Sequence, residues 1–401
     1  MSADLQKQYE AYPYPYRDPK SDAPIITFMN DLVLIGHYGF SGQAWCRQKD
    51  CRVLVAGGGT GDATLHLAMQ LSSVNPDAQI IHLDLSEVSN NITQQRLDHQ
   101  GYKNVKVVQG SLLDLPKGEH GTFDYINCSG VLHHLKEPNE GAKALCSVLK
   151  DHGVMSIMLY GELGRRIVYD IQNLAGMVTE ETEALDKRIP IVNEILAAVP
   201  EQNPLRNVFP LNIPDAELVD RYLHPQDRAY TVPQIFEMLA ASSLRLLSFL
   251  PKAHYDPLLM ISEGPLRDRV RDLPEEQRMA FAEILSGTMA RHMFFATKKE
   301  NNKPQMPDPS DLSLIPVLIG PGRRLRQQEF SGGVAFAQPV MERLELEHLK
   351  IASQMDGETS LNDIYQICSD QHNMSAEDFN KIWLEIYRVL GSRGNVVLKE
   401  G

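Results

Sequence analysis

The sequence lacks the features that mark a membrane-spanning, secreted or nucleic-acid-binding protein. No stretch approaches the roughly 18 to 20 apolar residues that a membrane span needs. The initial segment MSADLQK has no basic region followed by the apolar core of a secretory signal. A net charge of -13 opposes attraction to a phosphate backbone. These absences predict a soluble, cytoplasmic protein without a membrane or nucleic-acid partner.

Cysteine is scarce as well, with 5 residues in a chain of 401. No two of them form a Cys-x-x-Cys pair or a Cys/His cluster at zinc-ligand spacing, and the odd number argues against a disulfide framework. We therefore predict reduced thiols and no metal. The length itself suggests two or three units that each bury a core, and we expect one large domain and one smaller domain.

Short apolar runs alternate with helical segments from residue 52 onward. The expected strands are 52–56, 80–83, 105–108, 123–127, 153–160, 244–250 and 292–297, and helices are expected near 62–71, 87–99 and 138–150. This alternation predicts an α/β fold with a doubly wound, mostly parallel seven-stranded sheet.

Prolines and polar runs suggest where the domains divide. Repeated prolines break the pattern at 161–235, which indicates a helical insertion that could roof an active site, and the polar, proline-rich run from Lys298 to Pro309 is typical of a linker. The predicted organisation is an arm at 1–50, a main domain at 51–298, a linker at 299–316 and an accessory domain at 317–401.

A glycine-rich turn follows the first expected strand. Gly57, Gly59 and Gly61 would let a carboxylate or a phosphate approach bare backbone amides at the start of a helix. Asp84 ends the next strand, 23 residues after Gly61, where an acid can accept both ribose hydroxyls. The same features also fit a tight turn with a helix-capping aspartate, and they would suit a nicotinamide dinucleotide almost as well.

Four ordered segments narrow these alternatives. They are VLVAGGGTGD (53–62), LDLS (83–86), GSLLDLP (110–116) and FDYINCSGVLHHL (123–135). In this order they resemble the class I S-adenosylmethionine-dependent methyltransferases, which have a Rossmann-like fold. The resemblance covers 50–160 and continues weakly to about 298. It implies that S-adenosylmethionine is the cofactor.

The resemblance also implies roles for individual residues. Gly57, Gly59 and Gly61 would face the methionine part of the cofactor. The ribose would lie at Asp84 and Leu85, the adenine at Ser111 and Leu112, and the sulfonium near Cys128, Ser129 and Gly130.

The sequence departs from the family at two positions. Ala56 stands where the family places an acid at the end of its first strand, so Asp62 becomes the candidate contact for the cofactor amino group; it would equally suit a helix N-terminus as a favourable charge. Ser111 stands where many members have an acid beside the adenine.

Two histidines follow the fourth expected strand, at the edge of the sheet where ligands of open α/β folds bind. His133 or His134 could take a proton from the methyl acceptor, because a protonated acceptor must lose its proton before it attacks. The alternative is that this pair packs or caps the turn.

The arm contains the run YPYPYR, in which two prolines favour an extended backbone. Tyr12, Tyr14 or Arg17 could close over the cofactor, or the arm could be a strap packed on the surface. In the insertion, His224 and Tyr230 are candidate acceptor contacts, while Asp227 with Arg228 is expected to form an internal ion pair. His254 and Tyr255, which follow a strand, complete the acceptor candidates.

The accessory domain contains a run, Asp356 to Ile364, that weakly resembles regulatory modules of protein methyltransferases and winged helices that hold leader peptides. Its many acids disfavour DNA as a ligand, and formation of a homodimer is the alternative role. We expect a methyltransferase whose acceptor is a protein or peptide side-chain nitrogen, or otherwise a small molecule. A nicotinamide dehydrogenase and a catalytically silent binding subunit are more distant hypotheses.

Overall fold

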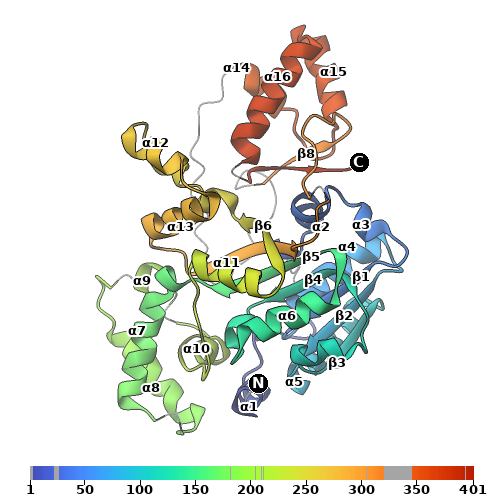
Figure 1. Ribbon diagram of the computed structural model, residues 1–401. Coiled ribbons are helices and arrows are strands. Elements are labelled where there is room, and N and C mark those ends of the chain that lie inside the picture. The colour runs from blue at the N-terminus through green and yellow to red at the C-terminus, as the bar shows by residue number, and fades with distance from the viewer. Residues whose placement is uncertain are drawn as a thin grey trace.

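Seven strands form one central sheet in the computed structural model, in the order β3-β2-β1-β4-β5-β7-β6 (Figure 1). The structure describes residues 3–21, 27–180, 182–203, 205–208, 210, 212–303, 305–319, 346–392 and 394–401. The strands are β1 (Arg52–Ala56), β2 (Gln79–Asp84), β3 (Val105–Gln109), β4 (Phe123–Ser129), β5 (Leu149–Tyr160), β6 (Leu244–Leu250) and β7 (Arg291–Lys298).

The first five strands run parallel, and β7 lies antiparallel between β5 and β6. This confirms the predicted doubly wound, mostly parallel sheet. The strand order reverses between β1 and β4, which are neighbours in the sheet. In open α/β sheets, ligands bind beyond the carboxyl ends of the strands at such a reversal, so the glycine turn after β1 stands at the expected place.

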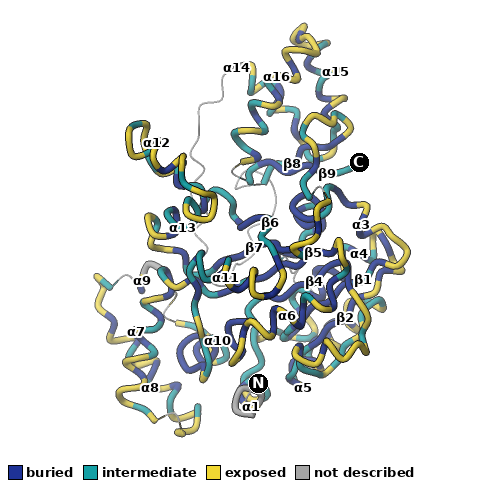
Figure 2. Tube along the Cα trace, in the orientation of Figure 1, coloured by how far each residue is buried: buried dark blue, intermediate teal, exposed yellow. Residues whose placement is uncertain are grey.

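The central strands read as continuous apolar runs because helices cover both faces of the sheet. Leu54 and Ala56 of β1 pack into the core on one face, together with residues of α6 (Pro138–Val148) and α11 (Val232–Ala241). Val53 and Val55 face the opposite core. Strands β1, β2, β4 and β7 are accordingly almost entirely buried, whereas the edge strand β3 is not (Figure 2).

The predicted arm consists of two different parts. One is a strap that starts with α1 (Ala3–Ala11) and continues along the surface to residue 21. The other contains α2 (Leu32–Ile35), the π-helical turn η2 (Gly36–Phe40) and α3 (Ala44–Arg47). Because their apolar side chains enter the core beside β1, these elements belong to the main domain.

The remaining helices of the main domain complete the layers. They are α4 (Asp62–Val74), α5 (Glu87–Gln100), α12 (Pro265–Arg271) and α13 (Glu275–Ser286), with short 3-10 turns η1 (Phe28–Asn30), η3 (Leu112–Lys117), η4 (Leu132–His134), η5 (Lys252–Tyr255) and η6 (Pro257–Leu259). Gly61 starts α4 with a left-handed backbone, and the Ser86 hydroxyl caps α5.

The insertion has a hydrophobic core of its own, built from apolar residues between Val168 and Leu223. It contains α7 (Glu162–Val178), α8 (Leu185–Ala198), α9 (Leu205–Val208) and α10 (Asp215–Tyr222). Since α7 begins directly after β5, the insertion stands beside the carboxyl edge of the sheet, where a roof over a site was expected (Figure 1).

The carboxy-terminal part also has a separate core. It contains β8 (Ile315–Leu318), α14 (Leu346–Ala352), α15 (Leu361–His372), α16 (Ala376–Ile386), the turn η7 (Tyr387–Gly391) and β9 (Val396–Lys399). β8 pairs with β9 in a two-stranded antiparallel sheet. The winged helix stays a prediction, and the portion of it at 320–345 lies outside the described residues. No helix in the described ranges has the length and apolar character to cross a membrane.

Candidate active site

The glycine turn between β1 and α4 is shaped to receive a ligand closely. Gly57, Gly59 and Gly61 have positive φ angles of 71°, 54° and 98°, which glycine adopts without steric cost. A Cβ on Gly57 would collide with Val131, and one on Gly59 would lie 2.7 Å from the carbonyl oxygen of Tyr14. The N–H groups of the turn are hydrogen-bonded within the protein, those of Gly57 and Gly58 to Leu83 and that of Gly59 to Asp84. The turn therefore offers a ligand close approach to the backbone at the positive end of α4.

Asp84 is fixed beside this turn at the end of β2. Its Oδ2 accepts a hydrogen bond from the backbone N–H of Gly59 at 2.8 Å, and its Oδ1 accepts one from that of Ser86 at 2.9 Å. Burial raises the pKa of the Asp84 carboxyl, while these N–H groups act to lower it. The carboxylate is oriented by backbone, as a group that holds ribose hydroxyls must be.

The residues predicted near adenine and sulfonium follow the next two strands. The N–H of Gly110 donates to the carbonyl of Asp84, which brings Ser111 to the same edge, and the Ser111 hydroxyl caps η3. Leu112 is buried. Cys128 points into the core, whereas the Ser129 hydroxyl accepts from Asn127. Their contacts with the cofactor stay predictions.

Asp62, the candidate for the cofactor amino group, is already paired in the structure. Its carboxylate accepts from the Arg17 guanidinium at 2.6 to 3.0 Å and from Arg96 Nη1 at 2.9 Å. Both oxygens are therefore engaged with arginines. A contact with the cofactor would have to share this carboxylate with both arginines. No residue next to Ala56 in the sequence supplies the acid that the family places at this position.

The strap crosses the glycine turn, which places Tyr14 and Arg17 at the predicted cofactor site. The Thr60 hydroxyl donates to the carbonyl of Pro15 at 2.7 Å, and the carbonyl of Tyr14 lies against Gly59. Beyond this crossing, the ion pair between Arg17 and Asp62 attaches the strap to the start of α4. Sequence reasoning left a lid and a surface strap open. These contacts show that the strap packs on the glycine turn, and closure over the cofactor stays a prediction.

The two candidate catalytic histidines differ in their surroundings. His133 stacks on Tyr160 with ring centroids 3.8 Å apart, and neither of its buried ring nitrogens has a hydrogen-bond partner. His134 Nδ1 lies 2.9 Å from the carbonyl oxygen of Gln226, so Nδ1 carries the proton and Nε2 holds the lone pair. Burial lowers the pKa of both rings and keeps them neutral.

Sequence analysis missed Asp220, the acid at the centre of this edge. It is 6% exposed, and its Oδ1 and Oδ2 accept hydrogen bonds from the hydroxyls of Tyr9 at 3.2 Å and Tyr160 at 3.3 Å. Burial and the neighbouring Asp220 raise the pKa of both tyrosines, which therefore remain donors. Arg165, whose guanidinium lies over the Tyr160 ring, is paired with Asp227. No local pattern marks Asp220, because its partners come from distant segments.

His224, a predicted acceptor contact, joins this cluster. It stacks on His134 with centroids 3.8 Å apart, and its Nδ1 accepts from the N–H of Gln226. Donor atoms of His134, Asp220 and His224 lie within 4.8 Å of one another, a spacing that could hold a metal ion. The two ring planes are only 27° apart, however, so their lone pairs run side by side instead of converging as metal ligation requires.

The other predicted acceptor residues lie elsewhere. Tyr255 stacks on Phe249, and its hydroxyl lies 2.9 Å from His292 Nδ1. Tyr230 is buried in the same core, and His254 immediately precedes Tyr255 in η5. The structure therefore does not bring these three into the cluster around Asp220, and their acceptor role stays a prediction.

We expected Asp227 to form an ion pair with Arg228, and this prediction was wrong about the partner of Asp227. Asp227 pairs with Arg165 at 3.0 Å, both almost fully buried, while Arg228 lies over the ring of Tyr230. Arg165 also covers Tyr160, with its guanidinium carbon 3.4 Å from the ring centroid. This pair links the insertion to β5 directly beside the cluster.

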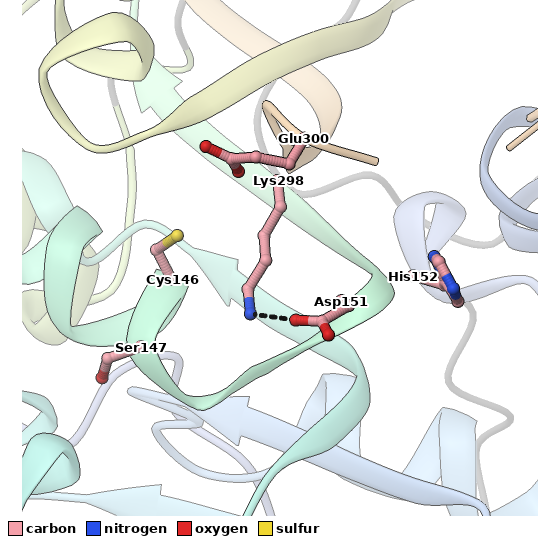
Figure 3. Close-up of a pocket in the computed structure, with 6 residues that line it drawn as sticks. All are labelled: Cys146, Ser147, Asp151, His152, Lys298 and Glu300. Carbon is pink, nitrogen blue, oxygen red and sulfur yellow. Dashed lines mark hydrogen bonds and ion pairs between the residues drawn. The ribbon is translucent and has the colours of Figure 1, made fainter. Parts of the chain in front are cut away.

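A surface pocket opens at the opposite edge of the sheet (Figure 3). It is lined by Cys146, Ser147, Asp151, His152, Lys298 and Glu300. Lys298 Nζ donates to Asp151 Oδ1 across it at 2.9 Å. Because β5 begins and β7 ends here, the pocket lies far from the carboxyl ends of the parallel strands.

Comparisons with known proteins agree with this geometry. The family model described as "Methyltransferase domain" matches residues 47–209. An uncharacterised protein of Synechococcus sp. is 32% identical over 296 residues, which covers 72% of this chain and 69% of that protein. A demethylmenaquinone methyltransferase of Lactococcus lactis is 34% identical over 95 residues, 24% of this chain and 36% of that protein.

Solved structures extend the similarity in fold to nearly the whole chain. The structure of PKMT2 from Rickettsia typhi matches with a TM-score of 0.67 at 14% identity, over 94% of this chain and 77% of that one. The same protein in complex with AdoHcy matches equally well. The chain belongs to the class I S-adenosylmethionine-dependent methyltransferases and uses S-adenosylmethionine as its cofactor.

Proposed function

We propose that this methyltransferase acts on a nitrogen, and specifically on a side-chain amine of a protein or peptide. The observation that carries this proposal is the buried carboxylate of Asp220, which accepts hydrogen bonds from two tyrosine hydroxyls. A buried carboxylate is most stable with a positive charge nearby. An acceptor ammonium would supply that charge.

The rings around Asp220 suit the same ligand. Tyr9, Tyr160, His134 and His224 surround the carboxylate, and aromatic faces attract ammonium groups, including alkylated ones. A neutral hydroxyl acceptor would gain less from the carboxylate charge and from the ring faces. The cluster therefore favours an amine over an alcohol or a phenol.

His134 is the residue that we assign to proton removal. Its Nε2 lone pair is available because the carbonyl of Gln226 holds the proton on Nδ1. The ammonium gives one proton to Nε2, and the freed nitrogen lone pair forms the new bond to the methyl carbon as the bond from that carbon to sulfur breaks. Bound S-adenosylmethionine supplies the methyl group and leaves as the neutral thioether. His133 packs against Tyr160 and supports this arrangement.

The cofactor would be held largely by groups that the structure already orients. The positive-φ turn at Gly57, Gly59 and Gly61 would face its methionine part, and Asp84, with Leu85, suits its ribose. Ser111 and Leu112 would border the adenine. Tyr14 and Arg17 would cover it from the strap.

A small molecule beneath the insertion, methylated on nitrogen or oxygen, is the second candidate. The insertion builds a separate core next to the cluster and could exclude water around a small acceptor. The similarity to a demethylmenaquinone methyltransferase over a quarter of the chain supports a small-molecule acceptor. The accessory domain, with its own core and an acidic sequence, supports a peptide or protein acceptor that it could help to hold.

A labelled-methyl experiment separates these candidates. The enzyme and methyl-labelled S-adenosylmethionine are incubated with cell lysate, which is then divided into protein and small-molecule fractions. We expect label in protein, recovered after acid hydrolysis as an N-methylated amino acid. Label confined to small molecules would select the second candidate, and label in O-methyl esters or ethers would contradict the proposed role of Asp220.

A further inference from the structure

The strap at residues 3–21 spans both turns that form the cofactor site. At its start, α1 packs on α5 and lies between α5 and α10 (Figure 1). The Glu10 carboxylate accepts the free backbone N–H groups of Glu87 and Val88, at 2.7 and 3.2 Å. These amides belong to the first turn of α5, directly after Asp84.

The strap then reaches the other turn. Pro15 accepts a hydrogen bond from Thr60, and Arg17 forms a bidentate ion pair with Asp62 at the start of α4. The strap is therefore attached on both sides of the space between the glycine turn and Asp84. A ligand that lies between these two groups is covered by the strap and has to displace it to leave.

One residue of the strap also reaches the acceptor cluster. The Tyr9 hydroxyl donates to Asp220 Oδ1 and faces His224 Nε2, both at 3.2 Å. Since Nδ1 of His224 accepts a backbone N–H, Nε2 carries the proton and donates to Tyr9. Tyr9, which belongs to the strap, thus orients the side chains of Asp220 and His224, which lie outside the strap.

We propose that the strap is a lid over the cofactor which also completes the acceptor site through Tyr9 as a positioning residue. Its second part rests on the proposed function of Asp220. The cofactor enters while the strap is open, and closure then places Tyr9 against Asp220 and His224. The acceptor site is complete only after the cofactor has bound, so the two substrates bind in a fixed order, and release of S-adenosylhomocysteine requires the lid to open.

The lid is tested without any acceptor, by the rate at which S-adenosylhomocysteine dissociates. Glu10→Ala removes one attachment of the strap and leaves α5 capped by Ser86. We expect dissociation to accelerate by about ten-fold, because two hydrogen bonds to a charged acceptor are lost. Glu140→Ala, which removes an acid from the first turn of α6 far from the strap, is the matched control and should dissociate at the wild-type rate. Equal rates for Glu10→Ala and wild type would overturn the lid.

The positioning role is tested with Tyr9→Phe, which keeps the ring and loses the hydroxyl. We expect unchanged affinity for S-adenosylhomocysteine and at least about ten-fold less methyl transfer to the lysate protein fraction. The deficit should lie in a raised KM for that fraction. Normal transfer by Tyr9→Phe would overturn the positioning role. A wild-type enzyme that labels no amine would refute the proposed function, while the dissociation rates would still decide the lid.

Discussion

The cofactor edge and the acceptor cluster lie side by side at the same end of the sheet but are built in opposite ways. At the cofactor edge, the backbone makes the decisive contacts: glycine amides form the turn, and N–H groups orient Asp84. In the acceptor cluster, side chains from α1, η4, β5 and α10 meet around Asp220. The first is built from the turns that follow β1 and β2, which are consecutive strands in the chain, whereas the second is assembled from four separate segments.

This difference has a consequence for variation. A site made of backbone needs glycine at fixed positions and tolerates few substitutions, while a site made of side chains can change its acceptor by exchanging one or two residues. We therefore expect substitutions at the cofactor edge to weaken cofactor binding, and substitutions in or beside the cluster to reduce stability or methyl transfer.

The largest effect on stability is expected at the buried ion pair beside the acceptor cluster. Arg165→Met leaves the Asp227 carboxylate buried without its cation, which costs about 3 to 5 kcal/mol of unfolding free energy. Urea denaturation measures the loss. The exposed pair of Arg271 with Asp268 provides the control, since Arg271→Met should change stability by less than about 1 kcal/mol. Equal losses in both variants would show that side-chain pairing does not hold this region together.

A smaller effect is expected at the cofactor edge. Asp84→Asn keeps the shape of the side chain but removes the charge that would hold the ribose hydroxyls. We expect the affinity for S-adenosylhomocysteine to fall by roughly 1.5 to 3 kcal/mol, with the fold intact. Calorimetry on the folded variant measures this affinity. An affinity equal to that of the wild-type protein would mean that the ribose is not held by Asp84.

A buried histidine under the glycine turn gives a pH dependence of stability. Burial lowers the pKa of His82 to about 4, below the value near 6.5 expected in the unfolded chain. As the pH falls below 6.5, the unfolded chain binds a proton that the folded protein does not bind until about pH 4, so stability decreases through this window. Between pH 6.5 and 5 the contribution is about 2 kcal/mol.

Denaturation of His82→Asn at both pH values isolates this contribution. The variant should lose less stability than the wild-type protein on acidification, and the surface variant His152→Asn should behave as wild type. A His82→Asn profile parallel to that of the wild type would mean that His82 takes up its proton at an ordinary pH in the folded state.

The sequence predicted the strands and the glycine turn far better than the cluster around Asp220. Strand β6 runs from 244 to 250, as its apolar pattern indicated, and the glycine turn joins β1 to α4 as expected. Such units are encoded locally, by hydrophobic period and by glycine at positive φ. Asp220 was missed because its hydroxyl donors lie 211 and 60 residues away in the sequence, and nothing in the sequence around it marks their convergence.

The wrong partner for Asp227 has a related cause. Sequence proximity suggested Arg228, but adjacent side chains point apart, and the buried carboxylate is instead paired with Arg165, 62 residues earlier. A buried charge selects the partner that folding brings within hydrogen-bond distance. The partner could therefore be found only once the insertion had been placed against β5.

The most direct test asks whether Asp220 acts on the methyl acceptor alone, while the cofactor edge binds the cofactor. Asp220→Asn should bind S-adenosylhomocysteine with wild-type affinity by calorimetry, yet lose methyl transfer to amines by about 100-fold, because the acceptor ammonium loses a buried charge partner worth roughly 3 kcal/mol. Undiminished transfer, or loss of S-adenosylhomocysteine binding in this folded variant, would contradict the assignment of Asp220 to the acceptor.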